Sequence, residues 1–336
     1  MDLSSNENQE KEVGILENNP ETAKTAELPQ NLKKDGLKKF FLGLGLGVLS
    51  VVILAAVIFG VGIYRFGWSG EIVAKITKVA PYPAVFVNWR MIGYYDYADD
   101  VETLKTFFAS QGEDLGAAIP DDKEIKKQVL DRLVKNELSY QLAKKYGIKI
   151  YDEDLEKEIQ NIVDQSESRE SVEQTLEEQY GWGIEEFKEK VLKPFLVQQK
   201  LQEAISKDET LNQEAKKKAE DVLAEIKKGE KSFEDLAKEY GEDATAEDGG
   251  DLGYFGKGTM VKEFETAAFS LGVGETSSLV LTEYGYHVIK VTEQIKDEAG
   301  EVSEVRASHI LIRTKSLDDF LTEELEKARV WQCVKL

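Results

Sequence analysis

The chain has 336 residues, and its 64 acidic side chains outnumber its 43 basic ones, which gives a formal net charge of −21. Such a polyanion repels the phosphates of nucleic acids, so we predict that the chain does not bind nucleic acid. One cysteine and two histidines exclude an intrachain disulfide and leave too few ligands for a structural zinc site, so we expect no metal and no other cofactor. The length predicts two or three domains.

The first part of the chain predicts a tail followed by a membrane span. Residues 1–39 are polar and contain no aromatic side chain, a composition typical of a disordered tail. Residues 40–64 contain no charged side chain, and a helix of that length spans roughly 37 Å, enough to cross a bilayer. These lengths favour an uncleaved anchor over a cleaved signal peptide or a buried core helix. The expected partner of residues 40–64 is therefore the lipid bilayer.

The charges beside this span predict its orientation. The lysines Lys33, Lys34, Lys38 and Lys39 precede it, whereas only Arg65 follows closely. Positive charge is enriched on the cytoplasmic side of membrane spans. We therefore expect a single-pass protein of the cell membrane whose N-terminus is cytoplasmic and whose bulk is extracytoplasmic.

Residues 65–207 predict an all-α domain in which no catalytic constellation is evident. After a short strand at 83–88, helices are expected from Asp122 to Gly147 and over 152–165, 168–180 and 184–207, the last kinked at Pro194. A further amphipathic helix is expected over 316–336, opened by a capping pattern at Ser316 and Asp319. Its apolar stripe must be buried, and we expect it to complete the helical domain.

Residues 208–314 predict a mixed α+β unit. Helices are expected over 211–228, 233–240 and 264–271, with a glycine-rich turn at 249–253 and extended runs at 278–282 and 286–292. Both histidines of the chain lie in strand-like runs, His287 within 286–291 and His309 within 307–313. If these runs are neighbours in one sheet, the two side chains define a site.

Several of these segments carry a resemblance to known families. The runs 233–240, 249–253 and 285–290, together with Met260 and Phe264, resemble the parvulin family of peptidyl-prolyl cis/trans isomerases. Residues 83–206 resemble, more weakly, the N-terminal chaperone domain of SurA-type foldases. The order of tail, anchor, chaperone domain and isomerase domain is similar to that of membrane-anchored PpiD-like and PrsA-like foldases. The resemblance implies an FKBP-like α+β fold for residues 208–314.

The resemblance also implies the residues of a site. The implied catalytic residues are His287, His309 and Asp243. The implied substrate-binding residues are Leu252, Phe255, Met260, Phe264, Thr282 and Tyr284. Thr282 is expected to join the hydrogen bonds of the histidines, which tune Asp243 rather than transfer protons. Tyr284 stands where some relatives have a small hydroxyl residue, and it is expected to narrow the pocket.

The implied function is that of a foldase that isomerises X-Pro bonds in unfolded or newly translocated polypeptides. Rotation about the prolyl bond is slow because the amide C–N bond has partial double-bond character, and catalysis requires no nucleophile. Only Arg313 is basic near the site, whereas a phosphorylated substrate would need a cluster of cations, so we expect a non-phosphorylated one. The alternative is a holdase chaperone that binds chains but isomerises them poorly. Self-association is left open by the sequence.

One departure from the family pattern concerns strand order. The family motif Ala-Ser-His-Ile-Leu normally opens the domain, but here it occurs at 307–311, after the last expected strand. The motif belongs either to a second, truncated domain or to a circularly permuted one, and we favour permutation because only 23 residues follow Arg313. If His287 faces His309, then Val291 faces Val305 and the chain reverses near 298, within the turn-like segment 297–300. A slip of one residue would separate the two histidines onto opposite faces.

Overall fold

The computed structural model describes residues 30–111 and 120–336. Its contacts divide the chain into two units that meet between Gly62 and Ile63. The predicted disordered tail lies outside the described residues from 1 to 29, but residues 30–39 are helical, so the tail prediction is wrong for them.

Helix α1 (Gln30–Phe66) contains the predicted apolar span. Within the described ranges, its segment Leu46–Phe66 is the one helical stretch long and apolar enough to cross a membrane, with a mean hydropathy of 2.8.

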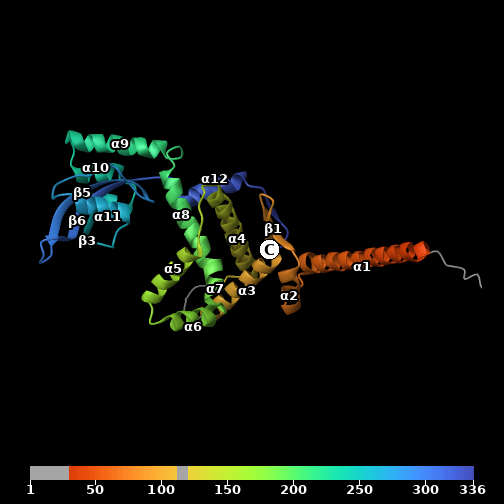
Figure 1. The fold of residues 1–336 in the computed structure, drawn as a ribbon. Coiled ribbons are helices and arrows are strands. Elements are labelled where there is room, and N and C mark those ends of the chain that lie inside the picture. Colours follow the sequence, from red (N-terminus) through yellow and green to blue (C-terminus); the bar gives the residue numbers. More distant parts are fainter. Residues whose placement is uncertain (1–29, 112–119) are drawn as a thin grey trace, which may run out of the picture. The chain divides into compact units, whose positions relative to one another are not determined.

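The helical part of the chain, residues 65–207, contains a small sheet as well as helices (Figure 1). Its elements are α2 (Glu71–Val79), β1 (Pro83–Val87), β2 (Arg90–Gly93), α3 (Tyr94–Gln111), α4 (Asp122–Lys145), α5 (Asp152–Asp164), α6 (Arg169–Tyr180), α7 (Ile184–Phe187), the π-helical turn η1 (Lys188–Leu192) and α8 (Lys193–Lys207). At the position of the predicted kink the structure has the π-helical turn η1 directly before α8, where Pro194 lacks an N–H group and crowds the preceding turn.

The prediction of an all-α domain is wrong. Strands β2, β1 and β7 (Val330–Gln332) form a three-stranded antiparallel sheet. A tight turn joins β1 to β2, and both of its residues, Asn88 and Trp89, have positive φ, as two-residue hairpins with right-handed strand twist require. Hydrophobic periodicity did not reveal β7, because three residues are too few to show a period.

The terminal helix α12 (Leu317–Lys327) is shorter than predicted, since the chain becomes extended at Ala328 and forms β7. Its start is as expected, with the Ser316 hydroxyl accepting a hydrogen bond from the Asp319 N–H group. Helix α12 packs against α4 and α8 through buried apolar side chains. They are Leu138, Leu142, Leu201, Ile205, Phe320 and Leu321.

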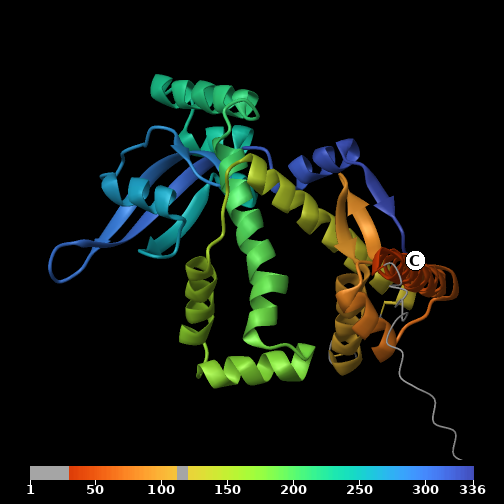
Figure 2. The same cartoon turned by 45° about the vertical axis from the view of Figure 1, so that its right-hand side comes forward.

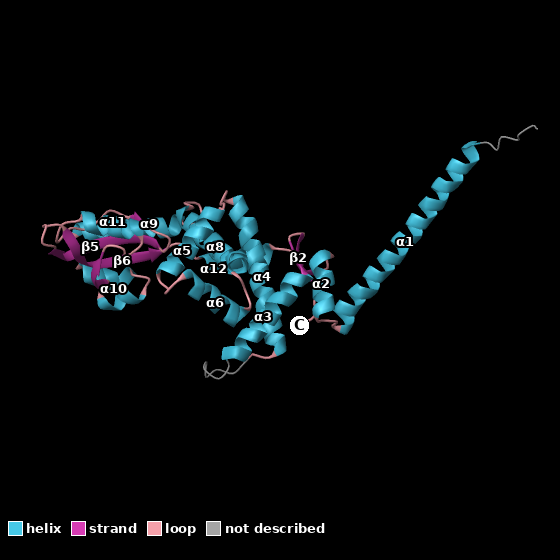
Figure 3. Cartoon of the chain, turned by 60° about the horizontal axis from the view of Figure 1, so that its bottom comes forward, coloured by secondary structure: helices cyan, strands magenta, loops and turns pink. Residues whose placement is uncertain are grey.

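Residues 208–314 form a sheet covered by helices on both faces (Figures 2 and 3). The elements are α9 (Gln213–Lys228), α10 (Phe233–Tyr240), the 3₁₀ turn η2 (Ala244–Asp248), β3 (Asp251–Gly256), α11 (Lys262–Ser270), β4 (Val280–Leu281), β5 (Gly285–Lys296) and β6 (Val302–Arg313). The strand order is β3-β6-β5-β4, all antiparallel. Successive side chains of β5 and β6 point to opposite faces of the sheet, so one face packs against α9 and α10 and the other packs against α11. We call this segment the sheet part.

Strand β6, which carries His309, lies between β3 and β5. The chain reverses where predicted, but the predicted register is wrong by two residues: His287 opposes Leu311, and His309 opposes Ile289. The reason is the loop, in which the Asp297 N–H group donates to the Glu301 carbonyl and so centres the reversal one residue later than expected. A shift of two residues keeps both histidines on one face.

Candidate active site

The two histidines lie diagonally on the α11 face of the sheet, where β5 and β6 pair. Both side chains are buried, with 4% of His287 and 6% of His309 exposed. Their rings are stacked at an angle of 17° with centroids 5.3 Å apart, and the two Nδ1 atoms are 3.1 Å apart. A diagonal pair of long side chains on one face is within contact range, so the revised register still produces the expected pairing of the rings.

A chain of hydrogen bonds runs through this pair. At one end, Thr282 Oγ1 lies 2.9 Å from His287 Nε2. At the other end, His309 Nε2 lies 2.9 Å from Asp243 Oδ2. Thr245 adds a residue that sequence reasoning missed, because its hydroxyl donates to Asp243 Oδ1 at 2.7 Å and lies 3.0 Å from His309 Nε2. The spacing Asp-x-Thr, with Asp243 capping η2 through the Thr245 N–H group, was the available signal.

The Asp243 carboxylate determines which atom donates and which accepts in each of these hydrogen bonds. Because a carboxylate only accepts hydrogen bonds, His309 Nε2 must carry the proton that faces Asp243. In neutral His309 this leaves Nδ1 as an acceptor, so His287 Nδ1 donates to it and His287 Nε2 accepts from the Thr282 hydroxyl. The Thr282 oxygen in turn accepts from the Tyr284 N–H group at 3.1 Å. Every polar atom of the chain is thus paired in a single tautomeric arrangement.

Burial keeps both imidazoles neutral. Desolvation, with a smaller contribution from the neighbouring His309, lowers the pKa of His287 to about 3. Desolvation also lowers the pKa of His309, although the carboxylate of Asp243 opposes this shift. At neutral pH the pair is therefore a rigid dipolar element rather than a pair of cations. In the described ranges no group of three His, Cys, Asp or Glu side chains could hold a metal ion.

Apolar side chains cover the rings. Phe264, from α11, meets both imidazoles edge-on, with centroids 5.2 Å from His287 and 5.6 Å from His309. The half-buried Leu252 and Met260 pack at the margin of the same apolar cluster. A buried polar floor therefore lies beside a partly open apolar wall.

The other two aromatic residues predicted for the pocket, Phe255 and Tyr284, differ in their exposure. Phe255 is buried, and its ring contacts those of Phe264 and Phe269, so it packs in the core behind the wall. Tyr284 is 58% exposed and is not part of the buried apolar clusters, although its N–H group donates to Thr282. The narrowing of the pocket by Tyr284 stays a prediction.

Comparison with known families defines the class of this protein. A model described as a PPIC-type PPIASE domain matches residues 195–295, and one described as a SurA-like N-terminal domain matches residues 37–202. The chain thus combines a parvulin-type rotamase domain with a SurA-like domain. Strand β6, at 302–313, lies outside the matched rotamase region although it is in the same sheet.

Individual relatives make the assignment more specific. Foldase protein PrsA 2 of Bacillus cereus is 34% identical over 230 residues, which cover 61% of this chain and 78% of the relative. Foldase protein PrsA of Halalkalibacterium halodurans is 32% identical over 230 residues, covering 60% and 68%. The chain belongs to the PrsA foldase family. Foldase protein PrsA of Bacillus subtilis is 59% identical over 80 residues, but the match spans only 24% of this chain and 27% of that relative.

Proposed function

We propose that the chain is a membrane-anchored extracytoplasmic foldase that catalyses cis/trans isomerisation of X-Pro bonds in unfolded polypeptides. The observation that carries this proposal is the hydrogen-bonded chain Thr282–His287–His309–Asp243 beneath the edge of the Phe264 ring. Membership in a family of foldases supports it. His287, His309 and Asp243 are the proposed catalytic residues, although none of them acts as a nucleophile.

The mechanism follows from the barrier to rotation. An amide resists twisting by about 18–20 kcal/mol because resonance holds the C–N bond planar. The proline ring would pack against Leu252, Met260 and Phe264, which fixes one side of the bond. The fixed dipoles of the paired imidazoles and Thr282 would then favour the twisted amide, whose charge distribution differs from that of the planar one. Each decrease of about 1.4 kcal/mol in the barrier accelerates rotation tenfold.

The surroundings of the site support a non-phosphorylated substrate. The basic residues of β6 on either side of His309 are Arg306 and Arg313. Arg306 forms ion pairs with Asp251 and Glu293. The Nε–H group of Arg313 donates to the Glu242 carbonyl at 2.6 Å. Its backbone N–H group donates to the Glu242 carboxylate at 2.7 Å. A cation engaged in this way is poorly placed to receive a phosphate group.

The proposed location follows from the apolar helix and the charges beside it. Residues 46–66 of α1 would cross the bilayer, with the lysine-rich segment 33–39 on the cytoplasmic side and residues after Phe66 outside. The clients would then be newly translocated polypeptides.

The proposed chaperone activity has a candidate surface on the sheet β2-β1-β7. Trp89 is 76% exposed and Trp331 is 69% exposed, and both line a shallow apolar groove of about 230 Å³ with Phe86 and Val330. Exposed aromatic groups of this kind bind unfolded chains at little cost in side-chain entropy. This surface suits both the foldase and the holdase alternative.

A prolyl isomerisation assay separates the two functions. The full chain, reconstituted in lipid nanodiscs, should accelerate the cis/trans exchange of an Ala-Pro peptide in a protease-coupled assay. A His309→Ala variant should lose most of this acceleration yet still suppress aggregation of an unfolded client. A wild-type rate equal to that of empty nanodiscs, with aggregation still suppressed, would establish the holdase instead.

A further inference from the structure

Helix α2 carries an apolar stripe that the rest of the described chain leaves partly or largely exposed. Ile72 is 73% exposed, Ile76 is 38% exposed and Val79 is 88% exposed. Their spacing of four and then three residues places them on one side of the helix. Another side is docked, since Val73 and Thr77 are buried where α2 packs against α3. The helix is therefore apolar on two sides, and only one of them is used within the fold.

The position of α2 in the sequence limits what can cover this stripe. Only residues 67–70 separate the end of α1 at Phe66 from the start of α2 at Glu71. Four residues reach at most about 14 Å, and each polar layer of a bilayer is about 5–7 Å thick. If α1 crosses the membrane, α2 therefore begins within or just outside the layer of lipid headgroups. The linker also contains Trp68, which is 45% exposed, and tryptophan is enriched at this depth.

The partners of the two lysines of α2 indicate that whatever covers the stripe contacts it mainly through apolar groups. Lys75 forms an ion pair with Glu71 at 2.6 Å. Lys78 Nζ lies 5.3 Å from the centroid of the Tyr95 ring. Both cations on this helix thus have partners within the protein, and their long side chains can extend toward headgroups while the stripe remains in the apolar layer.

We propose that α2 lies in the plane of the membrane interface, with Ile72, Ile76 and Val79 inserted among the upper parts of the lipid chains. The partner is the lipid bilayer itself, and the inference rests on the proposed anchor. An interfacial helix of this kind binds through its buried apolar area. Together with α1 it would hold the helical part against the membrane surface, so that the chain does not swing freely on its anchor.

Site-specific fluorescence in vesicles tests this proposal. The full-length chain with Cys333→Ser is given one new cysteine at a time, at Val57 in the span, at Ile72 or Val79 in the stripe, or at Val273. Val273 is a matched control because it is an exposed valine, at 59%, in the sheet part. Each variant is labelled with a nitrobenzoxadiazole group and reconstituted in phosphatidylcholine–phosphatidylglycerol vesicles with and without brominated lipid.

The proposal predicts quenching by brominated lipid of about twofold or more at positions 57, 72 and 79, and none at 273. High salt should leave the quenching at 79 unchanged, because an apolar contact is not screened. Adding Ile76→Glu should abolish most of the quenching at 79 while leaving that at 57, since a buried carboxylate is costly.

The outcomes distinguish the inference from the anchor on which it rests. Quenching at 57 with positions 72 and 79 behaving like 273 would overturn the inference and leave the anchor standing. Absence of quenching at 57 would overturn both.

Discussion

The carboxylate of Asp243 lies at one end of the hydrogen-bonded chain, and the hydroxyl group of Thr282 lies at the other. Because each neutral imidazole has one donor and one acceptor, a change at one end fixes the polarity of every group up to the other. The donor and acceptor roles of both histidines are therefore determined by Asp243, whose carboxylate can only accept hydrogen bonds.

Replacing Asp243 with asparagine should reverse the donor and acceptor roles in the series of hydrogen bonds from residue 243 to Thr282. The amide can donate to His309 Nε2, which would move the His309 proton to Nδ1 and turn His287 Nε2 into a donor toward Thr282. We expect kcat/KM to fall about tenfold or more with little change in folding, because one charge-assisted hydrogen bond is lost. Long-range ¹H–¹⁵N NMR of the imidazoles would report the tautomers.

A matched control is Glu247→Gln, which removes an exposed charge from the neighbouring turn η2. It should leave both the activity and the tautomers as in the wild type. Unchanged tautomers in Asp243→Asn would show that the carboxylate does not set the direction.

Burial of the histidines predicts how stability depends on pH. The pKa of His287 is about 3 in the folded state and about 6.5 in the unfolded state, so the unfolded chain binds the extra proton between these values. The free energy of unfolding should therefore be highest above pH 6.5 and fall on acidification, by up to about 1.4 kcal/mol per pH unit from this one group. His309 contributes in the same direction, because its pKa is also lowered.

Urea denaturation at a series of pH values between 7.5 and about 4.5 measures this slope. His287→Gln should reduce this slope by the equivalent of up to one proton taken up on unfolding, since a glutamine side chain does not titrate. An equal slope in the variant and the wild type would mean that His287 is protonated in the folded protein as readily as in the unfolded one.

At the scale of elements, the glycine-rich turn explains how β6 is held beside the loop before β3. The His309 N–H group donates to the Gly250 carbonyl at 2.9 Å, and Gly250 has a φ of 78°. A Cβ atom at Gly250 would stand 2.0 Å from the His309 carbonyl oxygen. The glycine-rich turn at 249–253 thus allows a close approach of two backbones.

Gly250→Ala should therefore destabilise the sheet part by about 3 kcal/mol or more, because the conformational strain of a left-handed alanine adds to a backbone clash. Gly258→Ala is the control: its φ is 87°, but a Cβ atom there meets nothing within 4 Å. The control should cost only about 1–2 kcal/mol. If thermal or urea denaturation shows the same loss of stability in Gly250→Ala and Gly258→Ala, the close approach of the two backbones does not contribute to the effect.

Some elements of the fold could be predicted from local sequence signals, whereas others depend on tertiary contacts. The helix from Phe233 to Tyr240 and the cap at Ser316 follow from local signals, and the structure has them as predicted. The hairpin register depends on the hydrogen bonds of Asp297 within the loop 297–301, and the turn-like composition of the loop does not specify their pattern. Strand β7 forms because β1 offers it an edge, with Trp331 opposite Phe86, and such tertiary pairing overrides local propensity.

The site was predicted more completely than the fold around it. The histidines, Asp243 and Phe264 were identified from a family resemblance and lie together in the structure. Thr245 was missed because a threonine in a turn is a common residue with many roles. Phe255 is buried against Phe264, and its assignment to the pocket stays a prediction, since an apolar side chain beside a site is equally suited to the core.

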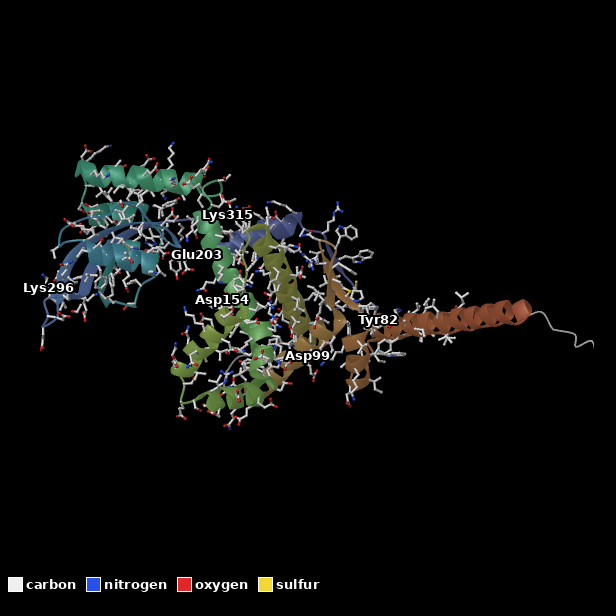
Figure 4. All side chains as sticks on the ribbon, viewed as in Figure 1. Tyr82, Asp99, Asp154, Glu203, Lys296 and Lys315 are labelled. Carbon is white, nitrogen blue, oxygen red and sulfur yellow. The ribbon has the colours of Figure 1, made fainter. Side chains whose placement is uncertain are left out.

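At the scale of the whole molecule, residues far apart in sequence join the helical part to the sheet part. The Ser206 hydroxyl, at the end of α8, donates to the Glu283 carbonyl at 2.8 Å, and the Gln202 side chain donates to the same atom at 3.0 Å. Gln202 also accepts from the Leu317 N–H group, just beyond Lys315, which Figure 4 labels near the upper end of α8. Thr282, in the active-site chain, is next to Glu283.

The proposed isomerase site is completed by a strand that comes from the C-terminal side of the sheet part. A chain ending at Gly300 lacks β6, which supplies His309 and pairs with both β3 and β5. A chain ending at Ser316 keeps β6 but lacks α12 and β7, so it is the matched control.

The most direct test is the rate of prolyl isomerisation by these two truncated chains beside the full one, each in nanodiscs. We expect the chain ending at Ser316 to keep its activity within about tenfold of the full chain, since the sheet remains whole, and the chain ending at Gly300 to have none. Activity in the chain ending at Gly300 comparable to that of the full chain would contradict this expectation, because His309 and β6 would then be dispensable.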